Sequence, residues 1–445
     1  MSANLSSLPA AAFSAASLPA AAPADLPAMF SVRQRLPRPR VGDLREAVET
    51  ALDAAQIPAR VRPGARVAIT AGSRGISDLP PILAAAAGRL RDLGAEPFIV
   101  AAMGSHGGGT VAGQGAVLAE LGVTPEAVGA PVVVTEEAVV LGTTPSGQPV
   151  YCDREAAAAD GILVVNRVKP HTAFRGAHES GLLKMLAVGL GKRYGAEAVH
   201  RRGPAGMEAG IVEAARIILG TGKVVGGLGI VENAYEETAI LEGFAPEEIE
   251  AGEARLLKAA RDLLPGLPAG EIDLLIVEEM GKNYSGTGMD TNVIGRWRIQ
   301  GVPEPEHPRV TRLVVLRLSE QSRGNATGIG LADFTTRRLV EATDWPATYL
   351  NCLTSTFVNR AMCPIALPSE REAILVALGS ANLPDRRKAR IMRVANTLHL
   401  ETVQVSEALL PALAGRPGVE VAPEAERLRF DGEGKLLPAA ALGHA

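Results

Sequence analysis

The chain has 445 residues, of which 47% are hydrophobic and 21% charged, and its formal net charge is −4. This composition indicates a globular protein of two or three domains, and the balanced charge with 3% aromatic residues argues against a nucleic-acid-binding surface. Three cysteines without a CxxC pair do not support a disulfide framework or a cysteine-rich metal site. No apolar run approaches the roughly 20 residues that span a bilayer. We therefore expect a cytoplasmic protein.

The first 28 residues are rich in alanine, serine and proline and predict a disordered leader. They lack the basic segment of a signal peptide, and prolines such as Pro9, Pro19 and Pro23 interrupt them. Strands and helices then alternate along the chain. The predicted strands are residues 29–37, 66–70, 97–103, 131–135, 160–166 and 223–231. The predicted helices are residues 45–55, 79–93, 114–121, 207–219 and 246–264, and a turn-rich hairpin is expected at 139–151.

Proline and glycine cluster at residues 264–270 and mark the best domain boundary. A second α/β unit follows, with strands at 272–278 and 312–318 and helices at 333–343, 370–378 and 386–397. We therefore expect an α/β fold of two α/β domains with the active site in the cleft between them. The expected domains are residues 29–268 and 269–425, and residues 426–445 form a tail.

Three of the predicted strands end in loops with polar side chains. Ser73 and Arg74 follow the strand at 66–70, His106 lies in a glycine-rich loop after 97–103, and His171 follows 160–166. Ligands of parallel sheets collect beyond the carboxyl ends of the strands, so we treat these residues as one candidate site. The alternative for each histidine is a structural role, as a helix cap for His106 or a surface turn for His171.

Lys184 lies within an apolar run, residues 181–190, that predicts a buried helix. A buried ammonium costs free energy unless it is paired, neutral or covalently modified, so we interpret Lys184 as an attachment point. The alternative is a lysine that extends from a helix edge to water. The neighbouring sequence GLGK at 189–192 is not a phosphate loop, because Leu186 and Arg193 replace the glycine and the serine or threonine that the motif requires.

These motifs resemble the lactate racemase family, in a homologous branch rather than the lactate-specific type. The resemblance runs from about residue 32 through the second α/β unit. It rests on GSRG at 72–75, GSHGGGT at 104–110, the stretch from VKPH to His200, and the loop at 281–296. It implies a racemase or epimerase that inverts the hydroxyl-bearing carbon of a 2-hydroxy acid by proton-coupled hydride transfer. The implied cofactor is a nickel-pincer nucleotide, a pyridinium mononucleotide with thioamide and thiocarboxylate groups.

The resemblance also implies roles for individual residues. Lys184 would bond covalently to the cofactor, and His200 would be the protein ligand of nickel. His106 and His171 would be the catalytic acid and base. The implied substrate ligands are Arg74 and Lys282, and the implied phosphate ligands of the cofactor are Ser73, Gly107, Gly108 and Thr110.

Two departures from the family pattern bear on the substrate. Ala71 stands where the lactate enzymes have an acidic residue, and the segment between His171 and Lys184 is longer. Both favour a larger hydroxy acid, such as a sugar acid. Arg201 and Arg202 are either ligands of a second anionic group or surface residues, and we expect His178 to be structural.

Two other functions stay open. One is a non-catalytic protein that binds an anion or nucleotide with the same loops, and the other is a metal-assisted lyase or dehydratase that uses His106 and His171. We expect a small-molecule substrate and the cofactor-building enzymes as partners, and neither nucleic acid nor a membrane. A homo-oligomer is compatible with the sequence.

Overall fold

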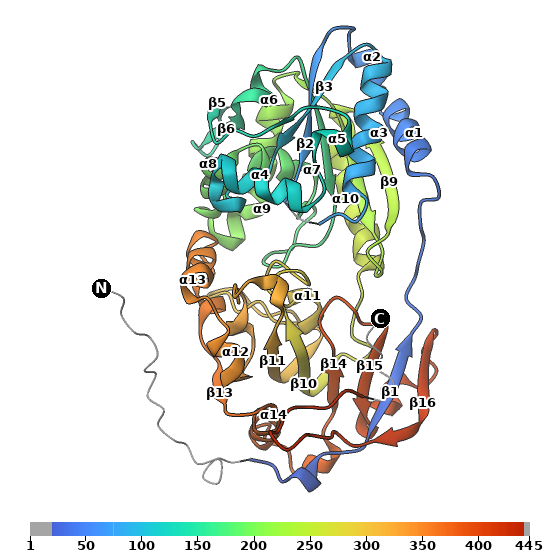
Figure 1. Cartoon of the computed structure of the whole chain (residues 1–445), viewed down its shortest axis with the longest axis vertical. Helices are drawn as coiled ribbons and strands as arrows, with labels where there is room; N and C mark the ends of the chain where they lie inside the picture. Colours follow the sequence, from blue (N-terminus) through green and yellow to red (C-terminus); the bar gives the residue numbers. More distant parts are fainter. Residues whose placement is uncertain (1–19, 74, 440–445) are drawn as a thin grey trace, which may run out of the picture. The chain divides into compact units, whose positions relative to one another are not determined.

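The computed structural model describes residues 20–73 and 75–439, which form two compact α/β units (Figure 1). The central unit comprises Leu36–Leu264, and the flanking unit combines the residues up to Arg35 with those from Pro265 onward. The predicted α/β fold with two α/β domains is confirmed. The division differs from the expected one at residues 29–35, because the strand there pairs within the sheet of the flanking unit.

A six-stranded sheet forms the middle of the central unit. Its order is β4 (Val132–Val133), β3 (Glu96–Ala101), β2 (Arg66–Ala71), β7 (Gly161–Arg167), β8 (Val224–Glu232) and β9 (Thr238–Phe244). All neighbours are parallel except β8 and β9. The chain runs from β2 outward to β3 and β4 and then returns on the other side of β2 as β7. The strand order therefore reverses between β2 and β7, which is where open α/β sheets bind ligands.

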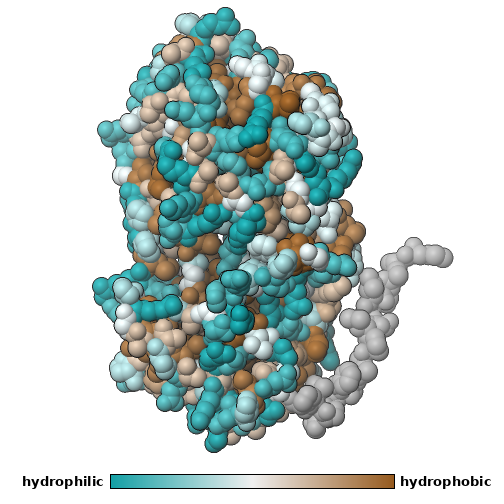
Figure 2. Space-filling model, turned by 180° about the vertical axis from the view of Figure 1, so that it is seen from behind, coloured by the Kyte–Doolittle hydropathy of each residue, from teal (hydrophilic) through white to brown (hydrophobic). Residues whose placement is uncertain are grey.

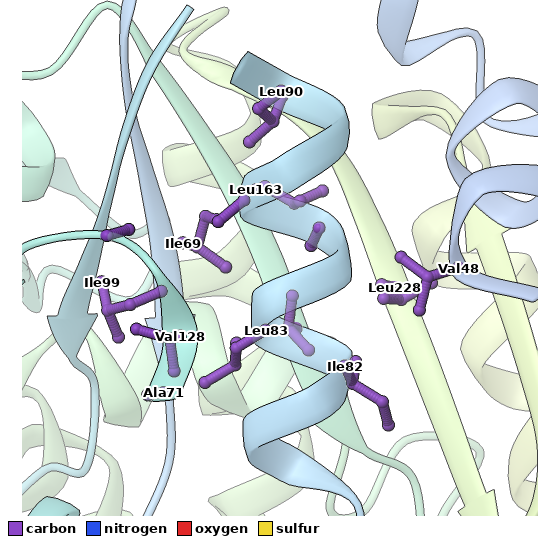
Figure 3. Close-up of a cluster of buried hydrophobic side chains, with 14 of the residues drawn as sticks. Val48, Ile69, Ala71, Ile82, Leu83, Leu90, Ile99, Val128, Leu163 and Leu228 are labelled. Atoms are coloured by element: carbon purple, nitrogen blue, oxygen red, sulfur yellow. The ribbon is translucent and has the colours of Figure 1, made fainter. Parts of the chain in front are cut away.

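Apolar side chains on helix α3 (Leu79–Asp92) pack against this sheet. Leu79, Ile82, Leu83 and Leu90 recur at helical spacing and have no more than 1% of their surface exposed. Figure 3 shows Leu83 and Leu90 facing Ile69 of β2 and Leu163 of β7. Each such buried side chain contributes about 1.5–3 kcal/mol, so this interface stabilises the strands whose ends carry the candidate residues.

The other elements of the central unit surround the sheet and its carboxyl edge (Figure 1). The helices are α1 (Leu44–Ala54), α2 (Ile57–Arg60), α4 (Val111–Glu120), α5 (Pro125–Val128), α6 (Arg154–Ala158), α7 (Leu182–Lys184), α8 (Lys192–His200), α9 (Gly203–Leu219) and α10 (Ile249–Leu263). A π-helix, Met185–Gly189, joins α7 to α8. Strands β5 (Ala138–Thr143) and β6 (Pro149–Asp153) form the expected hairpin.

The flanking unit contains an eight-stranded mixed sheet. Its order is β13 (Ile365–Leu367), β12 (Phe334–Thr336), β11 (Arg309–Leu318), β10 (Glu271–Met280), β14 (Ile391–Val394), β15 (Thr402–Ser406), β1 (Met29–Gln34) and β16 (Val419–Glu426). Strands β10 to β14 pair in parallel, and β15, β1 and β16 add antiparallel strands. The helices are α11 (Thr291–Ile294), α12 (Arg337–Glu341), α13 (Trp345–Thr354), α14 (Glu370–Gly379) and α15 (Leu410–Leu413).

Several expectations for the flanking unit are wrong. The helix predicted at 386–397 does not form: a 3-10 turn at Arg386–Lys388 is followed by strand β14, because Ile391–Val394 pairs with both β10 and β15. The helix predicted at 333–343 begins as strand β12. The described part of the predicted tail, up to residue 439, is packed as well, because β16 pairs with β1 and Leu436 is buried.

The predicted leader lies partly outside the described residues, at positions 1–19. The described part, residues 20–28, is packed rather than disordered. Ala21 and Leu26 are buried, and the Ala21 N–H donates to the Leu375 carbonyl of α14 at 2.9 Å. These contacts add apolar surface to the core of the flanking unit.

Within residues 20–73 and 75–439, no helix has the length and apolarity to cross a membrane. On the face shown in Figure 2, hydrophilic residues predominate and hydrophobic ones form separate small patches.

Candidate active site

The segment that carries Lys184 begins beyond the carboxyl ends of β2 and β7. Near the end of β7, the Asn166 side-chain amide donates to the Gly181 carbonyl at 2.8 Å. Just after β2, Gly72 allows close approach of Met185, whose Cε lies 3.1 Å from the position that a Cβ would take. Helix α7 is therefore anchored on both sides of the point where the strand order reverses.

Lys184 ends α7, and the chain continues as a π-helix instead of the predicted regular helix. The Leu190 N–H donates to the Met185 carbonyl, five residues earlier, at 2.8 Å. Such single π-turns are frequent at functional sites. Leu182, Leu183 and Met185 are buried, but Lys184 itself is only half-buried and its Nζ donates to Ser180 Oγ at 3.4 Å. The lysine is thus less enclosed than the sequence suggested.

His200 is the last residue of α8. Burial, together with the positive charge of Lys184, lowers the pKa of its imidazole to about 4. The two side chains therefore lie close enough for their charges to interact, and His200 is neutral at physiological pH. Neutral imidazole is the form that binds metal ions.

His106 lies in a loop that only glycine-rich sequence can form. Gly107, Gly108 and Gly109 all have left-handed backbone angles, and a Cβ on Gly107 would lie 2.6 Å from the backbone of Gly113. The His106 side chain is exposed, and its Nδ1 shares a hydrogen bond with Ser73 Oγ from the end of β2. The ends of β2 and β3 thus bring Ser73 and His106 together. Thr110 then caps α4 by accepting from the Gly113 N–H at 3.1 Å.

His171 is held in a loop that closes on itself after β7. Lys169 and Ser180 form a two-residue antiparallel bridge at its base. Nδ1 of His171 accepts from the Ala173 N–H at 3.1 Å, so in the neutral ring the proton resides on Nε2. Its backbone N–H donates to Glu179, whose side chain is completely buried.

A second buried carboxylate, that of Glu253 on α10, supports the start of α7. Its Oε2 accepts from the Leu183 N–H at 2.8 Å, and its Oε1 lies 3.4 Å from Nδ1 of His178. The hydrogen bond with Glu253 raises the pKa of His178 above its ordinary value, with further contributions from nearby glutamates. His178 thus contacts the carboxylate that holds the Lys184 segment.

The most buried lysine near the site is Lys192, which sequence reasoning passed over. Only 1% of it is exposed, and its Nζ donates to Ala101 O and Gln114 Oε1, both at 2.9 Å. Asp153 Oδ2 lies 3.1 Å from the same nitrogen. The signal that could have found it is the GLGK sequence, which we considered only as a phosphate loop.

Four further residues were predicted as possible ligands. Arg74 falls outside the described residues. Lys282 belongs to the flanking unit, where its Nζ donates to Gly286 O at 3.0 Å and to Asn351 Oδ1 at 2.9 Å. Arg202 pairs with Glu213 at 2.8 Å, whereas Arg201 is exposed.

Across the described part of the chain, no group of three or more histidine, cysteine, aspartate or glutamate side chains is arranged to hold a metal ion. A surface cavity of about 440 Å³ lies elsewhere in the central unit, between α1 and β9, and no predicted site residue lines it.

The chain was compared with known proteins at the level of families, sequences and structures. No protein-family model and no curated protein sequence matches it. Among solved structures, it is similar to the lactate racemase apoprotein from Thermoanaerobacterium thermosaccharolyticum, with 13% sequence identity and a TM-score of 0.49. The match covers 82% of this chain and 94% of that one.

Proposed function

We propose that this protein is a racemase or epimerase of 2-hydroxy acids that carries a nickel-pincer nucleotide on Lys184. The observation that carries the proposal is that Lys184 and His200 lie on the segment that starts where the strand order reverses, close enough for the charge of Lys184 to lower the pKa of His200. One side chain is an amine that is accessible for covalent bonding, and the other is an imidazole kept neutral by burial and by that amine.

The residues present fit the proposed cofactor. Lys184 would hold it covalently, and His200 would supply one nitrogen to the nickel ion. A single protein ligand suffices in this case, because the pincer itself brings further donors to the metal. When bound, the cofactor supplies the acceptor and donor of hydride, which a protein side chain cannot supply.

The protein itself would supply the proton transfers. His106 and His171 follow β3 and β7, the two strands on either side of β2, so one histidine comes from each side of Ser73. Because Nδ1 of His171 accepts from the Ala173 N–H, its Nε2 carries the proton and can donate it. When Nδ1 of His106 donates to Ser73, its Nε2 has a lone pair that accepts a hydroxyl proton. A racemase needs one such group for each hand of its substrate.

The remaining assignments follow from the resemblance. Arg74 and Lys282 as carboxylate ligands, and Gly107, Gly108 and Thr110 as phosphate ligands, stay predictions. The same holds for a sugar acid as the substrate.

The test is to produce the protein together with the cofactor-building enzymes and to analyse its peptides by mass spectrometry. We expect nickel and an added mass on Lys184, both absent in Lys184→Ala, while His106→Ala retains the adduct and loses turnover. Lys258→Ala, which removes an exposed lysine of α10, should behave like the wild type. An unmodified Lys184 without nickel would refute the proposal.

A screen of 2-hydroxy acids, including sugar acids, then tests the reaction by chiral separation of the products. We expect inversion at the hydroxyl-bearing carbon. Loading without inversion of any substrate would point to the binding protein, and loss of water or carbon–carbon cleavage would point to the lyase.

A further inference from the structure

We infer that Gln114 is a positioning residue for His106, and that the buried Lys192 fixes the orientation of the Gln114 amide. The contacts themselves are independent of any cofactor. Their consequence for turnover rests on the proposed function.

The loop that carries His106 has little of its own to hold it in place. Four of its glycines, Gly104, Gly107, Gly108 and Gly109, have left-handed backbone angles, and glycine has the largest conformational freedom to lose. The His106 side chain is exposed. Ser73 holds the His106 side chain, so a further group from outside the loop is needed to restrict the loop backbone.

Gln114 supplies this restraint from the first turns of α4. Its Nε2 donates to two loop carbonyls, to Gly104 O at 3.0 Å and to His106 O at 3.3 Å. Only 1% of Gln114 is exposed, so water does not compete for these bonds. One amide group thus ties the start of the loop to the backbone of His106 itself.

Lys192 decides which way this amide points. An ammonium can only donate, and its Nζ lies 2.9 Å from the Gln114 side chain, so the oxygen must face the lysine and the nitrogen must face the loop. Asp153 of β6 and the Ala101 carbonyl at the end of β3 hold the ammonium in turn. The buried charge pair therefore sets the position of the loop relative to the sheet edge.

A further contact relates the loop to the segment of Lys184 and His200. The Gly104 N–H donates to the Gly189 carbonyl, at the end of the π-helix, at 3.2 Å. A displacement of Gly104 would therefore change the position of His106 relative to this segment. A shift of about 1 Å in such a group can reduce turnover about a hundredfold.

Two substitutions separate the two contacts of Gln114. Gln114→Glu keeps an acceptor for Lys192 but has no donor for the loop carbonyls, and Gln114→Met removes both contacts. Gln404→Met is the matched control, because Gln404 is 2% exposed and accepts from Arg393 at 3.1 Å in the flanking unit. The joint variant Lys192→Met with Asp153→Leu removes the charge pair without leaving one charge unpaired.

Hydrogen–deuterium exchange of the unloaded chain provides a readout that needs no activity. In both Gln114 variants we expect amides of residues 104–110 to exchange about tenfold faster, while α3 is unchanged. The joint Lys192 variant should show a smaller increase, and Gln404→Met none in this loop. Unaltered exchange of 104–110 in both Gln114 variants would overturn the inference.

Turnover of the loaded protein tests the catalytic consequence. We expect both Gln114 variants to keep the adduct on Lys184 and a KM within about twofold, with kcat reduced at least about tenfold. A loosened loop with unchanged kcat would reject the positioning role. If the wild type takes up no cofactor, the proposed function fails, and the exchange measurement still decides the role of Gln114 in the loop.

Discussion

His200 illustrates how one half-buried side chain links the candidate site to stability. Burial and the charge of Lys184 hold its pKa at about 4, against 6.5 for an unperturbed histidine. As the pH falls, the unfolded chain therefore binds a proton before the folded chain does. The free energy of unfolding is unaffected above about pH 6.5 and decreases as the pH falls from there toward 4.

We predict that the free energy of unfolding falls by about 2 kcal/mol between pH 7 and pH 5 because His200 is protonated more readily in the unfolded chain. The linkage relation gives this value for the difference in pKa between the two states. His200→Gln should remove this part of the decrease. Urea unfolding at the two pH values measures it, and His399→Gln, at an exposed histidine, is the control. An equal decrease in the wild type and in His200→Gln would contradict the assignment.

The charge interaction between Lys184 and His200 can be measured in the unloaded chain. In Lys184→Met we expect the pKa of His200 to rise, because one of its two causes is removed, yet to stay below 6.5 because the imidazole is still buried. NMR titration of protein labelled at histidine provides the value. Lys258→Met should leave it unchanged, and a similar response to both substitutions would show that the two residues do not interact.

At the scale of elements, the glycine loop after β3 is the feature on which the candidate site depends most. Gly107 and Gly108 both have left-handed backbone angles, but they differ in their surroundings. A Cβ on Gly107 would meet the backbone of Gly113 at 2.6 Å, whereas a Cβ on Gly108 would have nothing within 4 Å. Gly107 is therefore required both because a side chain would clash with Gly113 and because its backbone is left-handed. Gly108 is required only because its backbone is left-handed.

We predict that Gly108→Ala costs about 1 kcal/mol of stability, the cost of a left-handed residue with a side chain. Gly107→Ala should cost at least about 2–3 kcal/mol, because the loop and α4 must also move apart. Chemical denaturation of both variants gives the comparison, with Gly108→Ala as the control. Equal costs would mean that the loop is not pressed against Gly113.

Secondary structure in the flanking unit shows where local pattern is insufficient. Residues 386–397 carry arginines and apolar residues at spacings compatible with a helix, and we predicted one. The structure forms strand β14 there, because Ile391–Val394 completes the backbone hydrogen bonds of β10 and β15. Partners more than a hundred residues away in β10 override the local preference.

At the scale of the whole molecule, the chain crosses between its two units twice, after Arg35 and after Leu264. Strand β1 lies between β15 and β16 in the flanking sheet, and its Met29 and Val32 are completely buried. Among the described residues, the buried core of the central unit begins at Val48, with Leu44 packed against it. Strand β1 thus stabilises the unit formed mainly by residues after Leu264.

We predict that deletion of residues 1–35 unfolds the flanking unit and leaves the central unit folded. Hydrogen–deuterium exchange should show loss of protection in β14 and β15 and unchanged protection in α3. A chain that begins at residue 20 retains β1 and is the control. Equal loss of protection in both units would show that they fold as one.

The sequence by itself determined the α/β class and the order of most elements in the central unit, because short apolar runs and helical spacing are local features. It also placed His106 and His171 directly after strands. Only the tertiary structure decided which lysine is enclosed. Lys184 has apolar neighbours in sequence but is only half-buried, whereas Lys192 is buried because Asp153 and Gln114, distant in sequence, meet it at the sheet edge. Burial depends on contacts across the fold, and these cannot be inferred from neighbouring residues alone.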